Sequence, residues 1–324
     1  MRAPDVAFPN LGIEIQSFSR VAFSVFGFNV MWYGIFITLG IFLGAVAAFR
    51  NTKRNGIAND LFLDFIIIAV PVSLFFTRMY YVVFNMDLYR NNWGSIFAFR
   101  SGGMGVYGGI ISAFATLFIY SYFKARKTKK GKTTEMAGRI GDTAVFGLLV
   151  GQIVGRLGNL VNQEAFGGYT DGLLAMQLRL QNISAEYGRR SIEFLQSVPA
   201  ETVRAPVTYE MLQNAYTVGG DVVVLVHPTF LYEMLLNTGI FIFLWFFRGH
   251  KKFYGELLLI YAAAYAFGRF FIENLRTDQL FLWNTQIPAS MFVSCVVFAC
   301  AVVLITLLRI RAGKSGIKEL TPDA

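Results

Sequence analysis

The sequence predicts an all-α integral membrane protein with seven transmembrane helices. Hydrophobic residues make up 55% of its 324 residues and charged residues only 15%, whereas soluble domains carry about 25% charged residues. The 33 phenylalanines are more than one soluble core needs, but several bilayer-spanning helices of about 20 residues would absorb them. Seven apolar stretches have about this length: 25–49, 61–84, 104–123, 143–161, 229–247, 257–272 and 287–308.

The basic residues indicate how these helices are oriented. All ten lysines lie in loops that follow the first, third, fifth and seventh stretches. An excess of lysine and arginine is typical of cytoplasmic loops, so we expect the N-terminus outside and the C-terminus in the cytoplasm. The net charge of +9 is then explained by membrane topology, and a nucleic acid is not expected as a partner.

The connection between the fourth and fifth stretches is long enough to fold by itself. It combines four arginines, six acidic residues, several aromatic residues, Pro199 and Pro206, a mixture that favours a small external insert. We therefore expect four parts: residues 1–164 with transmembrane helices 1–4, residues 165–226 as an external head domain, residues 227–310 with helices 5–7, and residues 311–324 as a cytoplasmic tail.

The sequence offers few ligands for a metal ion. Cys295 and Cys300 lie in an uncharged apolar run, where a thiol usually behaves as a small buried hydrophobic group. His227 and His250 are far apart in the sequence. Because the ligand clusters of zinc and iron–sulfur sites are missing, we expect no metal and no cofactor.

The end of the fourth stretch is polar for a membrane helix. Arg156, Asn159 and Asn162 are spaced by three residues, so on a helix they share one face and can line a cavity. An arginine at membrane depth is costly unless it is paired or hydrated, which makes Arg156 a candidate functional residue. The alternative is a buried ion pair, or a side chain that extends to the outer surface of the membrane.

The sixth stretch carries a second polar face, formed by Arg269, Glu273 and Arg276. Arg269 and Glu273 are spaced to pair with each other. If Arg156 and Arg269 converge instead, their two guanidinium groups suit a phosphate, whose oxygens they bind bidentately. A phosphate at the membrane surface indicates a phospholipid. Arg78 is a third candidate, with a structural ion pair as its alternative role.

Two further segments open transmembrane helices. In residues 227–233, Pro228 suits a helix start and Glu233 lies in the first turn, where it can simply complement the helix dipole. Residues 101–109 contain five glycines, which indicate close backbone approach or non-helical backbone that lines a cavity. Tyr33, near the outer end of the first helix, is also typical of the aromatic belt at a membrane interface.

With these segments in one chain, the sequence resembles the prolipoprotein diacylglyceryl transferase family of bacteria. The resemblance covers nearly the whole chain and rests on five segments: 32–34, 102–109, 155–167, 227–233 and 268–278. Its most specific part is Gly155-Arg156-Leu157-Gly158-Asn159, followed by Asn162 and Glu164. The resemblance implies a seven-helix fold with an external head domain, spanning the bacterial cytoplasmic (inner) membrane several times.

The resemblance also implies a reaction and its site. The family transfers a diacylglyceryl group from phosphatidylglycerol to the lipobox cysteine in the signal peptide of a prolipoprotein, and glycerol 1-phosphate leaves. The family arginines that match Arg156 and Arg269 are considered essential. The family positions that contribute to the lipid site match Tyr33, Asn159, Glu164 and Gly167. We add Tyr232 and Glu273 as expected contacts of phosphatidylglycerol, and other membrane lipids as neighbours.

One position departs from the family pattern. Many members have a histidine, often assigned as the base, where this chain has Tyr107. A cysteine thiol with a pKa of about 8.5 is mostly protonated at neutral pH, so its attack needs a proton acceptor. We expect Arg156 and Arg269 to hold the leaving phosphate, while Glu164 or Tyr107 assists the proton transfer. A tyrosine hydroxyl is a poor base because its pKa is about 10, so the alternative role of Tyr107 is to orient the substrate.

Two other classes of membrane protein compete with this interpretation. A lipid transporter would use intramembrane arginines equally well, although the sequence lacks the internal repeat that many transporters have. An intramembrane protease would need paired carboxylates, but Asp64 and Asp142 lie towards the cytoplasmic ends of their stretches. Formation of a thioether product separates a transferase from both classes.

Overall fold

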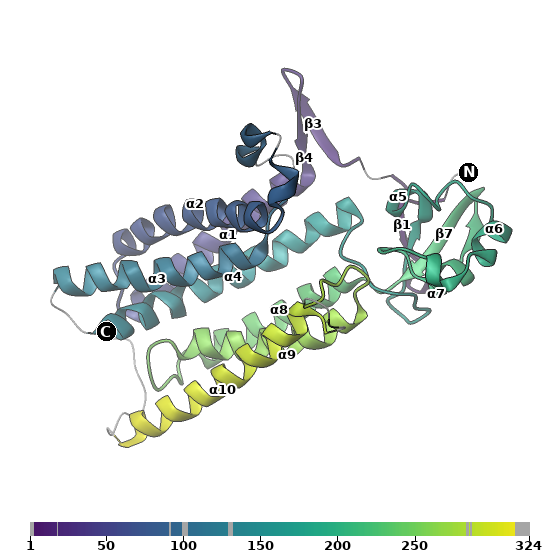
Figure 1. Cartoon of the computed structure of the whole chain (residues 1–324). Coiled ribbons are helices and arrows are strands. Elements are labelled where there is room, and N and C mark those ends of the chain that lie inside the picture. Colours follow the sequence, from purple (N-terminus) through teal and green to yellow (C-terminus); the bar gives the residue numbers. More distant parts are fainter. Residues whose placement is uncertain are drawn as a thin grey trace. The chain divides into compact units, whose positions relative to one another are not determined.

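The computed structural model describes residues 3–17, 19–90, 92–98, 103–128, 132–282, 285 and 287–314. Gly102, Lys129, Lys130 and residues 315–324 of the expected tail lie outside this part of the chain. The described residues form mostly helices (Figure 1). The long ones are α1 (Trp32–Thr52), α2 (Asn59–Phe84), α3 (Val106–Thr128), α4 (Thr133–Asn162), α8 (Thr229–Phe247), α9 (Glu256–Leu275) and α10 (Ala289–Lys314).

Six of the described helices are long and apolar enough to cross a membrane: α1, α2, α3, α4, α8 and α10. Most of their apolar side chains lie on the surface of the chain, which suits contact with lipid. The prediction of a helical integral membrane protein is confirmed to this extent. The remaining long helix, α9, has 20 residues, but Arg269 and Glu273 lower its mean hydropathy.

The starts of two helices differ most from the sequence prediction. The apolar stretch that begins at residue 25 starts as a hairpin, formed by β3 (Val21–Val25) and β4 (Phe28–Met31), and α1 begins only at Trp32. Phe26 and Gly27 have φ angles of 47° and 80°, and two positive φ angles suit the tight turn that joins twisted antiparallel strands. At the other boundary, α4 begins at Thr133, ten residues before the predicted apolar stretch.

The prediction of an all-α protein is wrong, because the chain also contains a five-stranded antiparallel sheet. The strand order is β2-β1-β5-β7-β6. The strands are β1 (Val6–Phe8), β2 (Ile13–Ile15), β5 (Met176–Arg179), β6 (Tyr216–Val218) and β7 (Asp221–Val226). Residues 6–15 therefore join residues 176–226 in one sheet. Hydrophobic periodicity did not indicate this, because the strands are short and β1 and β5 are buried throughout.

Short helices and an apolar core complete the sheet region. Helices α5 (Leu180–Ile183), α6 (Ile192–Ser197) and α7 (Tyr209–Gln213) flank β1 and β7 (Figure 1). The hydroxyl groups of Ser191 and Thr208 accept hydrogen bonds from backbone N–H groups in the first turns of α6 and α7, which stabilises both helix starts. Leu178, Leu195 and Met211 are among the fully buried core residues. This packing gives the region a hydrophobic core of its own.

The chain divides into two compact units that share several long helices. The first contains residues 1–45, 147–246 and 260–306, and the second contains residues 46–146, 247–259 and 307–324. The sheet region belongs to the first unit. In the second unit, α2 packs along α3, and its core includes Phe62, Phe65, Leu117 and Ile140. Short 3-10 turns η2 (Lys53–Asn55), η3 (Met86–Leu88) and η4 (Trp93–Phe97) follow the ends of its helices.

In the first unit, glycines allow α1 and α4 to pack closely. A Cβ atom at Gly44 would lie 2.6 Å from the carbonyl oxygen of Gly147, and one at Gly40 would lie 3.2 Å from that of Gly151. Small residues spaced by four let helix backbones approach in a membrane, where apolar side chains gain little by leaving lipid. Gly40, Gly44, Gly147 and Gly151 thus serve the packing of α1 against α4.

We expect Gly44→Ala to lower the stability of the protein. The added methyl group overlaps backbone atoms, and overpacking of this kind costs about 1–3 kcal/mol. The matched control is Gly239→Ala in α8, where a Cβ atom meets nothing within 4 Å and the gain in helix propensity is the same. Thermal unfolding in detergent, followed by tryptophan fluorescence, should show a lower midpoint for Gly44→Ala only. Equal midpoints would contradict close packing of α1 against α4.

Candidate active site

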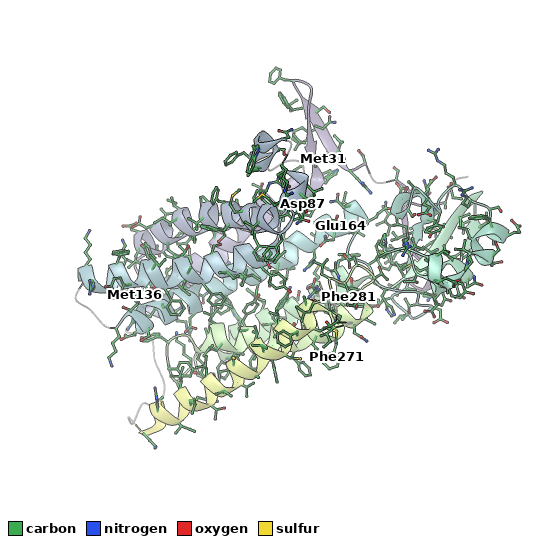
Figure 2. The ribbon with its side chains drawn as sticks, in the orientation of Figure 1. Met31, Asp87, Met136, Glu164, Phe271 and Phe281 are labelled. Carbon is green, nitrogen blue, oxygen red and sulfur yellow. The ribbon has the colours of Figure 1, made fainter. Side chains whose placement is uncertain are left out.

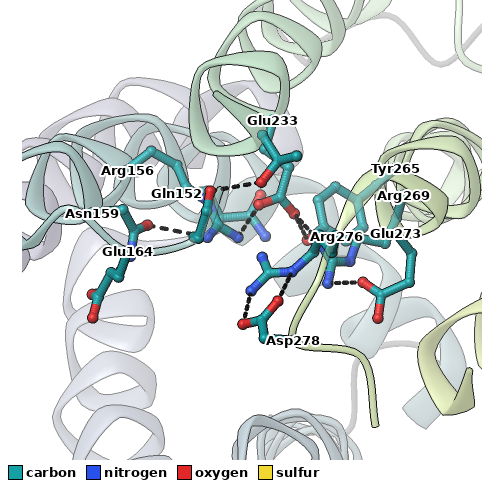
Figure 3. Close-up of polar contacts among 12 residues, drawn as sticks. Gln152, Arg156, Asn159, Glu164, Glu233, Tyr265, Arg269, Glu273, Arg276 and Asp278 are labelled. Atoms are coloured by element: carbon teal, nitrogen blue, oxygen red, sulfur yellow. Dashed lines mark hydrogen bonds and ion pairs between the residues drawn. The ribbon is translucent and has the colours of Figure 1, made fainter. Parts of the chain in front are cut away.

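Three helices of the first unit bring charged side chains to one place (Figure 3). Arg156 of α4 forms an ion pair with Oε2 of Glu233 in α8. Nη1 of Arg269 in α9 lies 3.1 Å from Oε1 of the same carboxylate. The two arginines that the sequence singled out therefore converge, and the group that joins them is Glu233.

Glu233 is fully buried, and its surroundings explain how a carboxylate is held there. Besides the two arginines, the hydroxyl group of Tyr265 donates a hydrogen bond to its Oε1. Arg269 also pairs with Glu273 one turn further along α9, which was the alternative considered from the sequence. Two arginines and two glutamates make this cluster neutral, and a charge at membrane depth is tolerated only when it is paired in this way.

The cluster extends towards the end of α4 through side-chain amides. Oδ1 of Asn159 accepts a hydrogen bond from Arg156, and Nδ2 of Asn159 donates to Oε1 of Glu164 at 2.9 Å. Asn162 donates to the same oxygen at 3.2 Å. Glu164 is exposed and lies just beyond the last turn of α4 (Figure 2). Asn159 thus links an exposed carboxylate to a guanidinium group of the cluster.

The backbone after α4 turns sharply. Gln163 and Ala165 have φ angles of 55° and 56°, a left-handed conformation that residues other than glycine rarely adopt and that carries strain. The turn is held by hydrogen bonds from the backbone N–H of Gly167 to the carbonyl of His227 at 2.8 Å and from Gly168 to Leu275 at 2.9 Å. These bonds fasten the connection after α4 to the start of α8 and the end of α9.

Gly167 lies where these segments meet. A Cβ atom there would lie 2.4 Å from the carbonyl oxygen of Leu275, so the close backbone approach requires glycine. Tyr33 of α1 is positioned by another glycine, because a Cβ atom at Gly158 would lie 2.5 Å from its ring. Both residues were expected at the lipid site, and the structure shows how the chain makes room for them.

Tyr232 lies at the start of α8, one residue before Glu233. Its hydroxyl group lies 3.1 Å from Nδ1 of His227. Burial lowers the pKa of the His227 imidazole, which favours the neutral ring, and with the ring proton on Nε2 its Nδ1 accepts a hydrogen bond from the Tyr232 hydroxyl group. The described polar contact of Tyr232 is therefore with His227.

Arg276 continues the polar face of α9 but bonds elsewhere. Its guanidinium group makes two contacts with the carboxylate of Asp278, at 2.9 and 2.6 Å. The backbone after α9 is held in turn by Gln279, which donates to the carbonyl oxygen of Glu273. Arg276 and Asp278 thereby form a bidentate pair beside the cluster.

Tyr107 lies in the second unit, in the first turn of α3. The centre of its ring is 6.2 Å from that of Tyr80 in α2, and a Cβ atom at Gly108 would lie 2.4 Å from Cβ of Tyr80. The described glycines of residues 103–109 therefore serve close packing against α2. The role of Tyr107 in proton transfer stays a prediction.

Arg78, the third candidate for binding phosphate, is almost fully buried in the second unit. Its guanidinium group donates hydrogen bonds to the carbonyl oxygens of Ser95, Ile96 and Gly103 at 2.7–2.9 Å. These bonds satisfy carbonyl groups of the connection between α2 and α3. They favour a structural role for Arg78, and the described hydrogen-bond acceptors of its guanidinium group are backbone carbonyl oxygens.

The carboxylates that an intramembrane protease would need are paired within the second unit. Asp142 is fully buried, contacts Nζ of Lys251 at 3.1 Å and accepts hydrogen bonds from the backbone N–H groups of Gly255, Leu257 and Leu258. Asp64 pairs with Lys124 at 2.9 Å. Among the described residues, no group of three or more His, Cys, Asp or Glu side chains is placed to hold a metal ion.

Two parts of the cluster were not predicted from the sequence. Glu233 was interpreted as a partner of the helix dipole, and Tyr265 was not among the candidate residues. A signal for Tyr265 was present, because it is four residues before Arg269 and so lies on the same face of α9. For Glu233 the sequence offered only its place in the first turn of α8.

The arrangement suits an anionic group with several oxygens. Each guanidinium group has N–H groups that do not contact Glu233. The side chains of Arg156 and Arg269 are 24% and 18% exposed, respectively. Guanidinium groups bind phosphate oxygens in pairs and keep their charge at any ordinary pH. The exposed carboxylate of Glu164, linked through Asn159, is a group that can accept a proton next to that anion.

Comparison with known proteins places this chain among enzymes of one kind. The profile of the family described as "Prolipoprotein diacylglyceryl transferase" matches residues 20–307. Three similar proteins, each named phosphatidylglycerol–prolipoprotein diacylglyceryl transferase, come from Clostridioides difficile, Finegoldia magna and Oceanobacillus iheyensis. They are 38%, 35% and 34% identical, over 81%, 88% and 90% of this chain and 85%, 94% and 88% of their own lengths, respectively.

We expect Glu233→Gln to destabilise the protein. The substitution leaves Arg156 and Arg269 without their shared counter-ion, and breaking a buried pair costs about 3–5 kcal/mol. Because solvent screens the charges of both partly exposed arginines, we expect the free energy of unfolding to fall by only about 2 kcal/mol. The control is Asp278→Asn, which removes a half-exposed partner and should cost less than about 1 kcal/mol. Thermal unfolding in detergent should give the lower midpoint for Glu233→Gln, and the reverse order would contradict a bridging role for Glu233.

Proposed function

The chain belongs to the prolipoprotein diacylglyceryl transferase family, and we propose on this premise that Arg156 and Arg269 form the phosphate clamp of its reaction. The enzyme transfers the diacylglyceryl group of phosphatidylglycerol to a prolipoprotein. The acceptor is the thiol of the lipobox cysteine in the signal peptide, and the product is a thioether. The observation that carries the proposed clamp is the convergence of both arginines on Glu233.

The bonds that change define what the site must do. The cysteine sulfur forms a bond to the glyceryl carbon of phosphatidylglycerol, and the bond from that carbon to the phosphate oxygen breaks. The electron pair stays on the oxygen, so glycerol 1-phosphate leaves with an additional negative charge. Preorganised cations lower the barrier most where charge develops, especially in a site that excludes water. Arg156 and Arg269 supply two such cations, and Asn159 orients Arg156.

The thiol must also lose its proton. Glu164 is our choice of acceptor, because its carboxylate is exposed and is joined to Arg156 through Asn159. Tyr107 is the alternative group for this proton transfer. Its other proposed role is to orient the substrate. Tyr33, Tyr232, Gly167 and Glu273 complete the proposed phosphatidylglycerol site, Gly167 through its backbone and Glu273 through its pair with Arg269.

The proposed topology adds α9 as a seventh transmembrane helix. The ion pairs of Arg269 with Glu233 and Glu273 offset the free-energy cost of placing this arginine at membrane depth. The lysine-bearing ends of α1, α3, α8 and α10 then face the cytoplasm, and the N-terminus lies outside. The external head domain consists of residues 165–226 together with β1 and β2. The arginine cluster lies near the ends of α4, α8 and α9 that face outwards, in the bacterial cytoplasmic (inner) membrane, where phosphatidylglycerol and signal peptides meet.

We expect Arg156→Ala and Arg269→Ala each to reduce thioether formation by about a thousandfold, as loss of one oxyanion donor does. Arg156→Lys should recover only part of the activity, because an ammonium group lacks the planar fork. The assay uses detergent-purified protein, phosphatidylglycerol and a lipobox peptide, with the mass gain on cysteine as readout. Arg190→Ala, in the sheet region, is the control for folding and should retain activity.

Full activity of folded Arg156→Ala and Arg269→Ala would contradict the phosphate clamp. Lipid binding without any thioether in the unmodified protein would instead favour a lipid transporter.

We expect Glu164→Gln to lower the rate at pH 7 by about a hundredfold, the lower end of the usual contribution of a general base. The loss should shrink as the pH rises towards 9, because the cysteine thiol, with a pKa of about 8.5, then ionises without help. Tyr107→Phe should change the rate only slightly and show no such recovery. The measurement is the pH dependence of thioether formation by each variant. The opposite pattern would assign proton transfer to Tyr107.

A further inference from the structure

A second polar layer lies one helix turn from the arginine cluster, on the side away from the sheet region. It is formed by Gln152 of α4, Asn237 of α8 and Tyr261 of α9. Each is four residues from a member of the cluster: Arg156, Glu233 and Tyr265, respectively. Residues four apart lie on one helix face, so the three helices that converge at the arginines also face one another here. Nε2 of Gln152 donates to the hydroxyl group of Tyr261 at 2.8 Å, which confirms that α4 and α9 meet at this level.

The layer contains polar atoms without partners. Asn237 is fully buried, and neither its Nδ2 nor its Oδ1 has a hydrogen-bond partner among the described residues. Oε1 of Gln152 is likewise buried and unpaired within them. Leaving an amide without partners in an apolar environment costs free energy comparable to several hydrogen bonds. The arginine cluster uses neither side chain, so the layer is suited to a ligand that brings its own polar group.

We propose that Asn237 binds an acyl ester group of the lipid substrate, with Nδ2 donating a hydrogen bond to the ester carbonyl. This inference rests on the proposed function, which places the lipid phosphate at Arg156 and Arg269. In a glycerophospholipid the three-carbon glycerol separates the phosphate from the ester groups. That span is close to the offset between the two layers, which is about 6 Å for four residues at a rise of about 1.5 Å each. Between the phosphate and the apolar acyl chains, the esters are the polar groups that the diacylglyceryl part offers.

The charge of the layer supports the same ligand. Asn237, Gln152 and Tyr261 are all uncharged, so the layer suits a neutral acceptor and not a second anion. An ester carbonyl accepts but does not donate, so it pairs with Nδ2. The two amide oxygens, Oδ1 and Oε1, need donors, and a water molecule that accompanies the ester has two protons to donate. Asn237 is therefore a positioning residue, because it fixes the glyceryl carbon relative to the phosphate clamp.

The test compares ester-linked phosphatidylglycerol with its diether analogue, which keeps the phosphate and the chains but lacks both carbonyl groups. The kcat/KM for thioether formation by the unmodified enzyme should be about tenfold higher with the ester lipid, the effect of one well-formed hydrogen bond. In Asn237→Leu, which has nearly the same volume, this preference should fall by about the same factor. Thr238→Val, whose hydroxyl group bonds only within α8 in the described structure, should keep the preference.

The preference is the ratio of the two kcat/KM values measured with the same variant. A loss of folded protein lowers both values equally and leaves their ratio unchanged. Asn237→Ala serves as the second variant if Asn237→Leu does not fold. A further measurement needs no variant: the ester lipid should raise the thermal midpoint of the unmodified protein in detergent more than the diether lipid does. An unchanged preference in Asn237→Leu or Asn237→Ala, or equal thermal shifts from the two lipids, would overturn the inference. Absence of any thioether with the ester lipid would instead contradict the proposed function.

Discussion

One buried carboxylate joins the three helices of the proposed active site. Glu233 is fully buried in α8 and joins Arg156 of α4 to Arg269 of α9. A guanidinium group cannot be deprotonated, so each arginine needs a partner wherever water is scarce. The shared partner brings three helices together at one point, while both arginine side chains stay partly exposed. The same ion pairs that stabilise the helix contacts thus preorganise the cations.

The surrounding structure keeps this point of contact in place. Glycines allow α1 to lie directly on α4, and Gly268 of α9 faces Leu236 of α8 at a distance that excludes a side chain. The strained turn after α4 is fastened to the start of α8 and the end of α9 by backbone hydrogen bonds of Gly167 and Gly168. The ends of the three helices are therefore tied to one another beside the arginines. A transferase needs this rigidity, because cations accelerate a reaction only when they are already in place.

The polar groups of the site form successive layers along the helices. Glu164 and Asn159 lie towards the C-terminal end of α4, the arginines and Glu233 follow, and Gln152, Asn237 and Tyr261 lie one helix turn further from that end. A phospholipid has the same order of chemistry, from a charged headgroup through neutral esters to apolar chains. In the proposed lipid site, this match accounts for the polar side chains that continue past the arginines, where an unpaired buried group is costly.

The sequence by itself determined the class of protein, the helices and the family, because apolar stretches of about 20 residues, loop lysines and a dense polar motif are local signals. It also indicated Arg156, Asn159, Glu164 and Arg269. The five-stranded sheet depends on pairing between residues 6–15 and 176–226, strands too short for a periodic pattern, so only the tertiary structure decided it. The same holds for Glu233 and Asn237. A lone glutamate or asparagine in an apolar helix carries no mark of its partners, which are set by how α4, α8 and α9 pack.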